Sequence, residues 1–513
     1  MFKDSKFNLI ELIIVIAIIG ILASIVIPNI SDFSIKAKDT RRMADIRNVQ
    51  TAVDMYYAKN NGEYPTNFKP LFTNEPIVWN ELYTDYIKQI PKMEEDEYFY
   101  IDPYGTVVVN YNTNASFLKW LKESRMIVSN PTDPVYEGML PPKGGVFLNY
   151  DINAGRFVDY NERPRILTLS VAMTGDCLLE AYKVTKDPIF LERAKMVGDY
   201  LSSNIYSVNF WGRNFHYIVA EKRYEGGAWV DRAEESYTKD MAITAKFLIE
   251  LSRITKDQSY AIEGKKLLDT LIEFQDLIET SPDYSVIAGA LPNFGLSTGI
   301  SWTQFPLDLG YMLHPATELA HSYFKEDKYL VLQEKYFNFI EKSFEEYSAI
   351  SLYGLPYGYV IYESGIFQGS NFDPVTGQWG RDKPITTDQL FYVIIGLQKA
   401  NSSRAKEMYN IVSQLANRNY HFWGQYSMSG NPVSSSYIEL CNTGFFLEMA
   451  KKYDPTIVRN IQENLLKTMN KSNNPDVDAS WVWAIGENYV ESLVSAVSAK
   501  SILYQETLNK YQK

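Results

Sequence analysis

The sequence lacks the clustered basic residues that a nucleic-acid-binding surface requires. Its 513 residues include 50 lysines and arginines against 62 aspartates and glutamates, and the formal net charge is −12 at pH 7. Contacts to a phosphate backbone depend on grouped Lys and Arg side chains. Because no such group occurs, we expect no nucleic acid among the partners of this protein.

Cysteine is nearly absent, with two residues, Cys177 and Cys441. The fold therefore cannot depend on a disulfide framework, although a single bridge stays open in an oxidising compartment. Both cysteines fall in patterns typical of a helical core, which favours two buried free thiols.

Histidine is scarce as well, and the sequence holds four: His216, His314, His321 and His421. None of their spacings is that of metal ligands, so we predict no metal site. Neither cysteine lies beside a motif histidine, which argues against a cysteine nucleophile. The two Gly-Gly pairs are too short for a phosphate-binding loop. We therefore predict no cofactor.

A long apolar run lies in the first thirty residues. Residues 12–27 carry no charge, and the stretch 9–30 is interrupted only by Glu11. That length is sufficient to cross a bilayer as a helix, so we predict a transmembrane helix over 7–30. A carboxylate inside such a segment is unfavourable unless it has a partner, which makes Glu11 a functional candidate.

The string KFNLIEL, from Lys6 to Leu12, resembles the processing site of type IV prepilins and type II secretion pseudopilins. With Phe7 as the first mature residue, Glu11 is the fifth, and Pro28 falls where these families place a helix-kinking proline. The resemblance implies that prepilin peptidase removes a leader of residues 1–6 and that Phe7 is N-methylated. It also implies that Glu11 pairs with the N-terminus of a neighbouring subunit. The residue before the cut is Lys6, where the families have glycine.

The same resemblance implies a location and a set of partners. We expect a single-pass protein of the inner (cytoplasmic) membrane, with most of the chain extracytoplasmic, in a filament or at its tip. The expected partners are the lipid bilayer, other pilin subunits, and the pilus or type II secretion assembly machinery. Basic residues after the apolar run would by themselves favour a cytoplasmic location, and the resemblance outweighs that signal.

A stem helix and a small sheet are predicted after the membrane segment. Apolar residues recur at helical spacing in Ile46, Val49, Val53 and Tyr56. Two β-patterns, 98–101 and 106–111, flank the turn 102–105. We therefore expect a pilin-like α+β unit over 31–128, resembling the major pseudopilins as far as residue 111. Those pseudopilins bind calcium, but no residue set here matches that site, and we interpret 94–97 as an acidic surface loop.

The remainder of the chain is predicted to be helical. Residues 129–144 are rich in turn formers and predict a linker, and beyond them helical patterns come in pairs. The pairs are 163–185 with 189–205, 234–255 with 259–274, 311–324 with 329–344, 385–399 with 403–418, and 437–453 with 455–469, and a last helix covers 487–510. Each helix is amphipathic and must bury its apolar stripe on neighbours, which implies an open solenoid or a closed ring.

The connections favour the ring, because the long ones lie between pairs and repeatedly carry aromatic and acidic residues. The organisation of 145–513 is similar to the α/α toroids of the six-hairpin glycosidase type, which include hydrolases, lyases and epimerases. Arranged in a ring, the connections would form a funnel lined by tryptophans and carboxylates. Aromatic residues make up 14% of the chain, with 38 tyrosines and 9 tryptophans, and such side chains suit stacking on sugars as well as a large core.

The candidate site residues follow from this arrangement. Glycoside hydrolysis needs two carboxyl groups on opposite sides of a bond. The catalytic candidates are Asp231 and Asp388 first, then Glu235, Glu439 and Glu487. The candidates for binding sugar are Trp229, Trp302, Trp379, Arg381, Trp423, Trp481, Trp483 and Tyr489. The alternative role of each acid is helix capping, which stabilises a helix by about 0.3–1 kcal/mol.

We therefore predict a membrane-anchored, pilin-like surface protein whose toroid binds polysaccharide and hydrolyses or otherwise modifies it. Whether the toroid is catalytic stays open at this level. The alternative is a non-catalytic minor pilin or adhesin, or a type II secretion pseudopilin with an enlarged protein-binding head.

Overall fold

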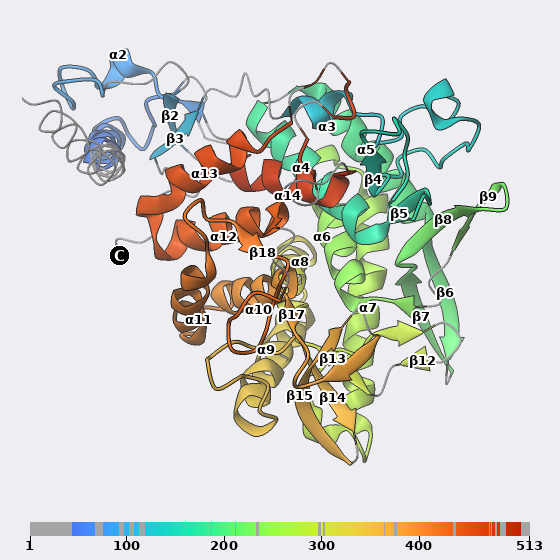
Figure 1. Cartoon of the computed structure of the whole chain (residues 1–513). Coiled ribbons are helices and arrows are strands. Elements are labelled where there is room, and N and C mark those ends of the chain that lie inside the picture. The colour runs from blue at the N-terminus through green and yellow to red at the C-terminus, as the bar shows by residue number, and fades with distance from the viewer. Residues whose placement is uncertain are drawn as a thin grey trace, which may run out of the picture. The chain divides into compact units, whose positions relative to one another are not determined.

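The computed structural model describes residues 44–503 except for 67–74, 92–96, 102–106, 112–117, 160, 186, 211, 232–234, 296–298, 301–302, 364, 374–376, 434–437, 471, 473, 478–479 and 483–488. The expected leader, transmembrane helix and assembly residues Lys6, Phe7, Glu11 and Pro28 lie outside the described residues. Within the described part, no helix has the length and apolar character needed to cross a membrane. The chain divides into two compact units, one of 1–112 with 454–460 and 505–513, the other of 113–453 with 461–504 (Figure 1).

The first unit has the predicted stem helix and sheet. Its helix occupies residues 44–59 in the described part of the chain. The antiparallel sheet has the order β1 (Glu75–Pro76), β2 (Glu97–Ile101) and β3 (Val107–Tyr111), and a short helix, α2 (Trp79–Leu82), lies between β1 and β2. The predicted stripe is confirmed, since Ile46, Val49 and Val53 are buried in one core with Phe99 and Val107. This unit is therefore a pilin-like α+β fold.

In the second unit, the described residues form an inner ring of six helices. They are α4 (Thr168–Thr185), α6 (Thr238–Thr255), α8 (Gly310–Phe324), α10 (Thr387–Lys399), α12 (Leu440–Tyr453) and α14 (Ser492–Leu503). Each packs against the next, and α14 returns to pack against α4. The ring therefore closes, as predicted, and an open solenoid is excluded.

A second helix follows each inner helix up to α12. These helices are α5 (Pro188–Ser203), α7 (Gln258–Thr280), α9 (Lys328–Glu346), α11 (Arg404–Val412) and α13 (Val458–Lys467). Tight turns make the reversals: Lys256 at the end of α6 has φ 65°, and Lys325 at the end of α8 has φ 60°. The side chain of Asp257 then caps α7 by accepting a hydrogen bond from the Ser259 N–H at 3.0 Å. Asp187 caps α5 in the same way.

Short strands brace the starts of the inner helices. The antiparallel sheets are β4 (Asn149–Asp151) with β21 (Tyr489–Glu491); β5 (Arg165–Leu167), β8 (Glu221–Glu225) and β9 (Ala228–Asp231); β6 (Ile205–Phe210) with β7 (Arg213–Ile218); β10 (Glu235–Ser236), β11 (Phe294–Gly295) and β12 (Gly299–Ile300); β13 (Gln304–Pro306), β14 (Tyr359–Glu363), β15 (Ile366–Asp373) and β16 (Gln378–Gly380); β17 (Ile385–Thr386) with β19 (Gln425–Tyr426); and β18 (Phe422–Trp423) with β20 (Ile438–Glu439). Strands β5, β17, β20 and β21 lead directly into inner helices. Five inner helices begin later than predicted: α4 at 168, α6 at 238, α10 at 387, α12 at 440 and α14 at 492.

The segment expected to be a linker, 129–144, packs into the second unit. The Tyr136 ring is buried, and its hydroxyl donates a hydrogen bond to the backbone oxygen of Arg125 at 2.6 Å. A short helix, α3 (Lys119–Glu123), precedes it and packs against α5. The turn formers thus build tight turns around buried aromatic rings, and the helical unit begins at residue 113 instead of 145.

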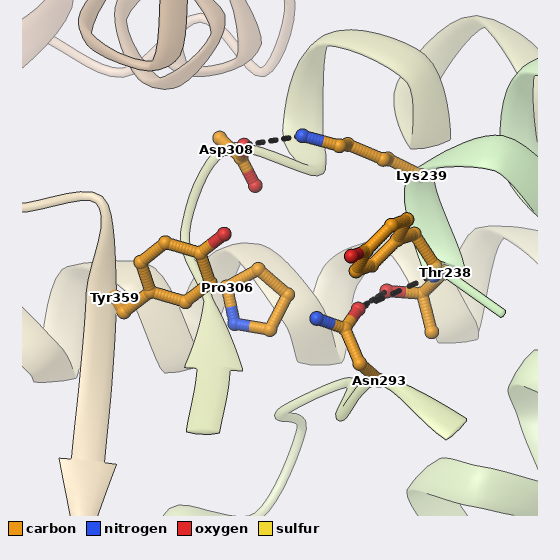
Figure 2. Close-up of a pocket in the computed structure, with 7 residues that line it drawn as sticks. Thr238, Lys239, Asn293, Pro306, Asp308 and Tyr359 are labelled. Atoms are coloured by element: carbon orange, nitrogen blue, oxygen red, sulfur yellow. Dashed lines mark hydrogen bonds and ion pairs between the residues drawn. The ribbon is translucent and has the colours of Figure 1, made fainter. Parts of the chain in front are cut away.

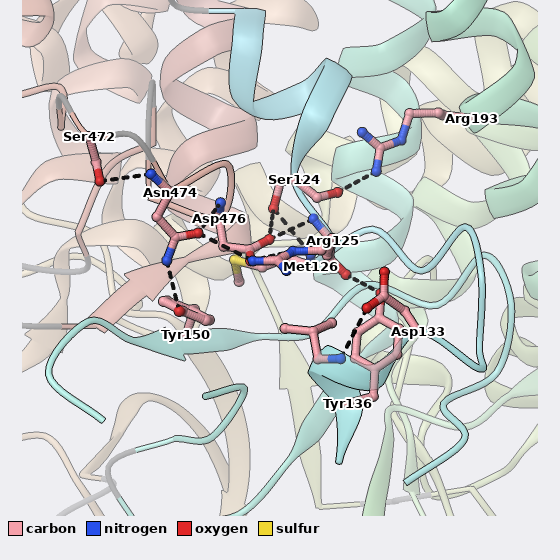
Figure 3. Close-up of polar contacts among 11 residues, drawn as sticks. Ser124, Arg125, Met126, Asp133, Tyr136, Tyr150, Arg193, Ser472, Asn474 and Asp476 are labelled. Carbon is pink, nitrogen blue, oxygen red and sulfur yellow. Dashed lines mark hydrogen bonds and ion pairs between the residues drawn. The ribbon is translucent and has the colours of Figure 1, made fainter. Parts of the chain in front are cut away.

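A buried carboxylate joins this early segment to the end of the ring. Asp476 is fully buried and accepts hydrogen bonds from Ser124 Oγ at 3.1 Å and Arg125 N at 2.6 Å. The Arg125 guanidinium completes the set through Nε at 2.9 Å and Nη2 at 2.5 Å (Figure 3). Nearby, the amide of Asn474 donates to the Tyr150 hydroxyl at 2.8 Å. The ring is therefore sealed by residues more than 300 positions apart in the sequence.

Both cysteines are free and buried, as predicted: Cys177 lies in α4 and Cys441 in α12.

Candidate functional site

Acidic side chains gather where the inner helices begin. Asp240 and Asp388 lie in the first turns of α6 and α10, and Asp308 lies two residues before α8. Glu439 directly precedes α12, and Glu491 directly precedes α14. These carboxylates interact electrostatically, since Asp388 affects the ionisation of Asp308, Glu439 and Glu491. The ring therefore brings together acids that are spread over some 250 residues of sequence.

A cavity of about 230 Å³ lies beside Asp308. Its lining residues are Tyr237, Thr238, Lys239, Asn293, Pro306, Asp308 and Tyr359 (Figure 2). The ammonium Nζ of Lys239 lies 3.3 Å from Oδ2 of Asp308. On the opposite wall, Asn293 Oδ1 accepts hydrogen bonds from the backbone N–H and the hydroxyl of Thr238, both at 3.4 Å. The start of α6 and the approach to α8 thus form one polar pocket.

Asp308 is the fully buried acid of this pocket. Its Oδ2 faces Lys239, whereas its Oδ1 has no hydrogen-bond partner among the described residues. Burial raises the pKa of Asp308, Lys239 opposes that rise, and Asp388 adds to it. Although burial disfavours a charged amine, the surrounding carboxylates raise the pKa of Lys239, so its ammonium stays protonated. The pocket therefore combines a fixed cation with a carboxyl oxygen that is available to a ligand.

Asp388, Glu439 and Glu491 form a second acidic group at the starts of α10, α12 and α14. Burial raises the pKa of Glu439 well above its ordinary value, Asp388 and Glu491 add to this, and Asn442, which donates to Glu439 Oε2 at 2.9 Å, opposes it. Burial also raises the pKa of Glu491 to about 8, with a further contribution from Asp388 and an opposing one from Arg165. Glu439 and Glu491 are therefore protonated near neutral pH in the unliganded protein.

Asp240 is also buried and belongs to the same polar region. Burial raises the pKa of Asp240 to about 7, an effect that Lys239 reduces and Asp308 increases. An acid whose pKa lies near or above 7 carries a proton at neutral pH, as a general acid must. Asp240, Glu439 and Glu491 can therefore act as proton donors.

Two of the predicted tryptophans lie beside this region. Trp379 on β16 packs edge-on against the cavity residue Tyr359, with ring centroids 4.9 Å apart. Trp423 on β18 accepts a hydrogen bond at its backbone oxygen from the Thr387 hydroxyl, 2.5 Å away, at the start of α10 next to Asp388. Both are partly exposed, so each can present an aromatic face to a ligand.

Several predicted site residues have structural contacts elsewhere. Trp481 is fully buried, and its indole N–H donates to the Leu465 backbone oxygen at 3.0 Å, which makes it a core residue. The prediction that Trp481 lines an open funnel is therefore wrong. Trp229 is held by a hydrogen bond to the Met139 backbone oxygen at 3.0 Å and by edge-on packing against Phe147.

Asp231 and Arg381 are also placed away from the acidic groups. Asp231 is exposed at the end of β9, where it accepts hydrogen bonds from Lys222 and from the Tyr206 hydroxyl. The exposed Arg381 guanidinium lies over the Tyr357 ring, 5.0 Å from its centroid. Of the two leading catalytic candidates, the structure places Asp388 in the acidic region and Asp231 in a surface ion pair.

The remaining candidates are less fully described. Tyr489 lies on β21 two residues before Glu491, and a hydrogen bond joins its hydroxyl to Asp151. Glu235 is described through its backbone, which pairs with Gly295. Trp302, Trp483 and Glu487 lie outside the described residues.

The sequence predictions missed Asp308, Lys239, Asp240 and Glu491. The predicted acids combine a helix start with a nearby tryptophan, whereas position directly before or within the first turn of an inner helix is by itself enough to select these residues. A G-x-S-x-G string also occurs at 295–299. Its end residues, Gly295 and Gly299, pair with each other in the antiparallel strands β11 and β12, whereas a nucleophile elbow connects a strand to a helix.

Metal ligation has no support in the described residues, which contain no group of three or more His, Cys, Asp or Glu side chains suited to holding an ion. Of the histidines, His421 is buried with Nδ1 2.9 Å from the Thr443 hydroxyl.

A separate charged network lies farther along the inner helices, beyond their first turns. Asp176 on α4 is fully buried between Lys246 on α6 and Lys500 on α14, and Glu448 on α12 pairs with Lys399 at 2.8 Å. These residues line a cavity of about 190 Å³. Every charge named here has a partner, so this network joins helices across the ring.

No protein-family model matches the chain. Its N-terminal part is 38% identical over 109 residues to the type II secretion system core protein G of Aeromonas hydrophila, a match covering 20% of this chain and 69% of that protein. The corresponding protein of Escherichia coli (strain K12) is 33% identical over 123 residues, covering 22% and 78%.

The second unit is similar in structure to sugar-converting enzymes. A D-mannose isomerase aligns with TM-score 0.52 and 12% identity, over 76% of this chain and 96% of that one. Cellobiose 2-epimerase from Bacillus thermoamylovorans B4167 aligns with TM-score 0.51 and 10% identity, over 76% and 98%. At such identities the likeness shows the fold alone, and it confirms the predicted α/α toroid of the six-hairpin glycosidase type.

Proposed function

The chain belongs to the family of the type II secretion system core protein G through its N-terminal fifth, and from this premise we propose a membrane-anchored, pilin-like surface protein whose toroid binds and hydrolyses polysaccharide. The observation that carries the proposal is the convergence of Asp308, Asp388, Glu439 and Glu491 at one end of the inner ring. Hydrolysis of a glycosidic bond requires a proton donor and a proton acceptor on opposite sides of that bond.

In the proposed reaction, Glu439 is the general acid. Its raised pKa keeps the proton that the leaving glycosidic oxygen must receive when the carbon–oxygen bond breaks. Asp308 Oδ1, on the cavity wall, takes a proton from the attacking water, whose oxygen forms the new bond to the anomeric carbon. Lys239 stabilises the Asp308 carboxylate before that transfer. The reaction consumes one water, and the proton gained by Asp308 replaces the one lost by Glu439 through solvent.

The aromatic wall would orient the sugar. Trp379 and Trp423 are the predicted sugar-binding residues that lie beside the acidic region, and Tyr359 lines the cavity itself. The apolar face of a pyranose ring stacks favourably on such side chains. Tyr359 and Trp379 would therefore set the position of the sugar ring next to Asp308.

The N-terminal segment would hold the toroid at a membrane. The apolar run 7–30 fits a single span of the inner membrane, with the toroid on the extracytoplasmic side. Pairing of Glu11 with the N-terminus of a neighbouring subunit would bring the protein into a filament with other pilin subunits, after processing by prepilin peptidase and with the secretion assembly machinery. The toroid would then act on polysaccharide at the cell surface.

A reducing-sugar assay and a glycan array on the full chain in detergent micelles test this proposal. We expect Asp308→Asn and Glu439→Gln each to lower hydrolysis at least ~100-fold while binding persists. The control is Glu273→Gln on α7, which changes an exposed pair with Arg213 and leaves activity unchanged. Absence of binding to any polysaccharide would contradict the proposal.

A protein-binding head is the second candidate. It is favoured by exposed apolar side chains near the β14–β15 turn, where Ile366 is 57% and Tyr362 is 38% exposed. If Ile366→Ser abolishes adhesion to cells while wild-type protein cleaves no glycan, the adhesin is the correct function.

A further inference from the structure

The cavity beside Asp308 has a hydrogen-bond acceptor available on one wall. Asp308 is fully buried, and its Oδ2 accepts from the Lys239 ammonium at 3.3 Å. Its Oδ1 has no hydrogen-bond partner among the described residues, and Figure 2 shows this oxygen pointing into the space beside Tyr359. A buried carboxylate oxygen without a donor is unfavourable, so we expect a ligand to supply one.

A hydrogen-bond donor is available on the opposite wall. Asn293 Oδ1 accepts from the backbone N–H and the hydroxyl of Thr238, both at 3.4 Å. Because a backbone N–H can only donate, this contact fixes which end of the Asn293 amide faces Thr238. The amide nitrogen Nδ2 therefore faces away from Thr238, towards Pro306 in Figure 2. Neither of its N–H groups has a hydrogen-bond partner in the part of the chain that the structure describes.

The space between these two walls is larger than a single hydroxyl group needs. Its volume is about 230 Å³, whereas one water molecule occupies about 30 Å³ in the liquid. The rings of Pro306, Tyr237 and Tyr359 also line it, so part of its surface is apolar. The pocket therefore suits a group that has a donor at one end, an acceptor at the other, and apolar atoms beside them.

A secondary amide has this arrangement. Its planar trans form points the N–H and the C=O in opposite directions, so one amide can donate to one wall and accept from the other. A hydroxyl group has a single oxygen for both contacts. An amide is also uncharged and leaves the ion pair of Lys239 with Asp308 intact, whereas an ammonium or a carboxylate would be repelled by one member of that pair. In a sugar, the acetamido group supplies such an amide, together with a methyl group for the apolar wall.

We propose that the glycan recognised by the toroid contains a 2-acetamido sugar, whose N–H donates to Asp308 Oδ1 and whose carbonyl oxygen accepts from Asn293 Nδ2. This inference rests on the proposed function and names its substrate class. In the proposed reaction, Asp308 acts on the water that attacks the anomeric carbon C1, so the substituent on the adjacent C2 is the one that reaches this carboxylate. A carboxylate oxygen has two lone pairs, and one stays available to the water.

The test is calorimetric titration of the full chain in detergent micelles with three tetrasaccharides: N-acetylglucosamine, glucosamine and glucose, all β-1,4-linked. We expect the acetylated tetramer to bind ~10–100-fold more tightly than either other oligomer, because a site built to pair with an amide keeps unpaired polar atoms when the amide is missing. A glycan array extends the comparison to other linkages and C2 epimers, and the glycans that it retains should carry acetamido groups.

A variant of Asn293 tests the donor. Asn293→Asp keeps the oxygen that faces Thr238 and replaces the amide nitrogen with a second oxygen. The preference for the acetylated tetramer should therefore fall to within about threefold, while the affinity for the glucose tetramer changes by less than about threefold. Glu273→Gln on α7, in the exposed pair with Arg213, should keep the full preference. A preference that survives Asn293→Asp overturns the inference.

A measurement on the unaltered protein does not depend on the folding of any variant. In saturation-transfer difference NMR with the N-acetylglucosamine tetramer, the acetyl methyl protons should receive more saturation than any other ligand protons, because they pack on the Pro306 and tyrosine rings. Methyl saturation below that of the sugar-ring protons would place the acetamido group outside the cavity and would contradict the inference.

The outcomes separate this inference from the function on which it rests. Equal affinity for the three tetramers, a preference for an unacetylated one, or an array that retains only glycans without acetamido groups overturns the acetamido assignment and leaves polysaccharide binding intact. Failure to bind any of the three, together with an empty glycan array, overturns both.

Discussion

Lys239 at the start of one inner helix pairs with Asp308 at the approach to the next, with 3.3 Å between Nζ and Oδ2. Their side chains are 21% and 1% exposed. The pair therefore both joins α6 to α8 and opposes the rise in the pKa of Asp308 that burial causes.

Replacing the cation should separate these two roles. Lys239→Met leaves Asp308 buried without a charge partner, so its pKa rises further and hydrolysis falls ~100-fold or more. The free energy of unfolding, measured with urea, should fall by about 3–5 kcal/mol, and the double variant Lys239→Met/Asp308→Asn should recover part of it. As a control, Lys119→Met in the exposed pair with Glu123 should change stability by less than about 1 kcal/mol.

The pH dependence of stability should reveal Glu491. Its pKa is about 8 in the folded protein and 4.5 ordinarily, so the folded state binds the extra proton between these values. The associated stability is present at pH 4.5 and is lost as the pH rises through 8. Glu491→Gln mimics the protonated acid, so its unfolding free energy should gain on that of the wild type between pH 5 and 9. Parallel curves for the two proteins would contradict the buried, protonated state of Glu491.

The hydrogen bonds that join Asp476 to Ser124 and Arg125 should contribute strongly to stability. Asp476→Ala removes the acceptor of Ser124 Oγ and of three Arg125 N–H groups, one in the backbone and two in the guanidinium. Because Asp476 is fully buried, we expect a loss of about 3–5 kcal/mol in urea unfolding. Glu273→Ala, in an exposed pair, serves as the control and should cost under about 1 kcal/mol. If the two variants lost the same free energy of unfolding, the hydrogen bonds of Asp476 would not be formed.

The crossing of α8 and α10 depends on two glycines in contact. A Cβ at Gly396 would lie 2.8 Å from the backbone carbon of Gly310 and 3.0 Å from the Tyr311 nitrogen. Gly396→Ala should therefore force the helices apart and lower the unfolding free energy by about 1–3 kcal/mol, despite the higher helix propensity of alanine. Thermal unfolding measures this, with the exposed substitution Glu407→Ala on α11 as the reference.

Processing of the N-terminus can be tested by intact mass spectrometry of the membrane fraction. Lys6 occupies the position where the prepilin families have glycine, so Lys6→Gly should raise the fraction of chains that begin at Phe7 and carry an added methyl group. An unchanged mass distribution would show that Lys6 does not limit processing.

Periodicity predicted the architecture well, because each helix carries its own apolar stripe. The stem stripe at Ile46, Val49 and Val53 and the closed ring both follow from local spacing plus the need to bury apolar faces. Asp388 and Glu439 were predicted because an acid at a helix start is visible in the sequence.

The features that the sequence did not predict depend on contacts between distant parts of the chain. Glu491 is held by the pairing of β21 with β4, so Val490 lies opposite Tyr150, some 340 residues earlier. No local pattern predicts that register. Trp481 and Trp379 both lie in connections that precede an inner helix, yet one is a core residue and the other packs against the cavity residue Tyr359.

The contacts that close the ring also set the order in which the toroid can assemble. Strand β4 and the Ser124–Arg125 pair belong to the first part of the ring to leave the ribosome, while Asp476, β21 and α14 are among the last. Until those residues have been synthesised, the early segment has no counterpart and Glu491 has no place. The proposed site would therefore form only after the last inner helix has joined the ring.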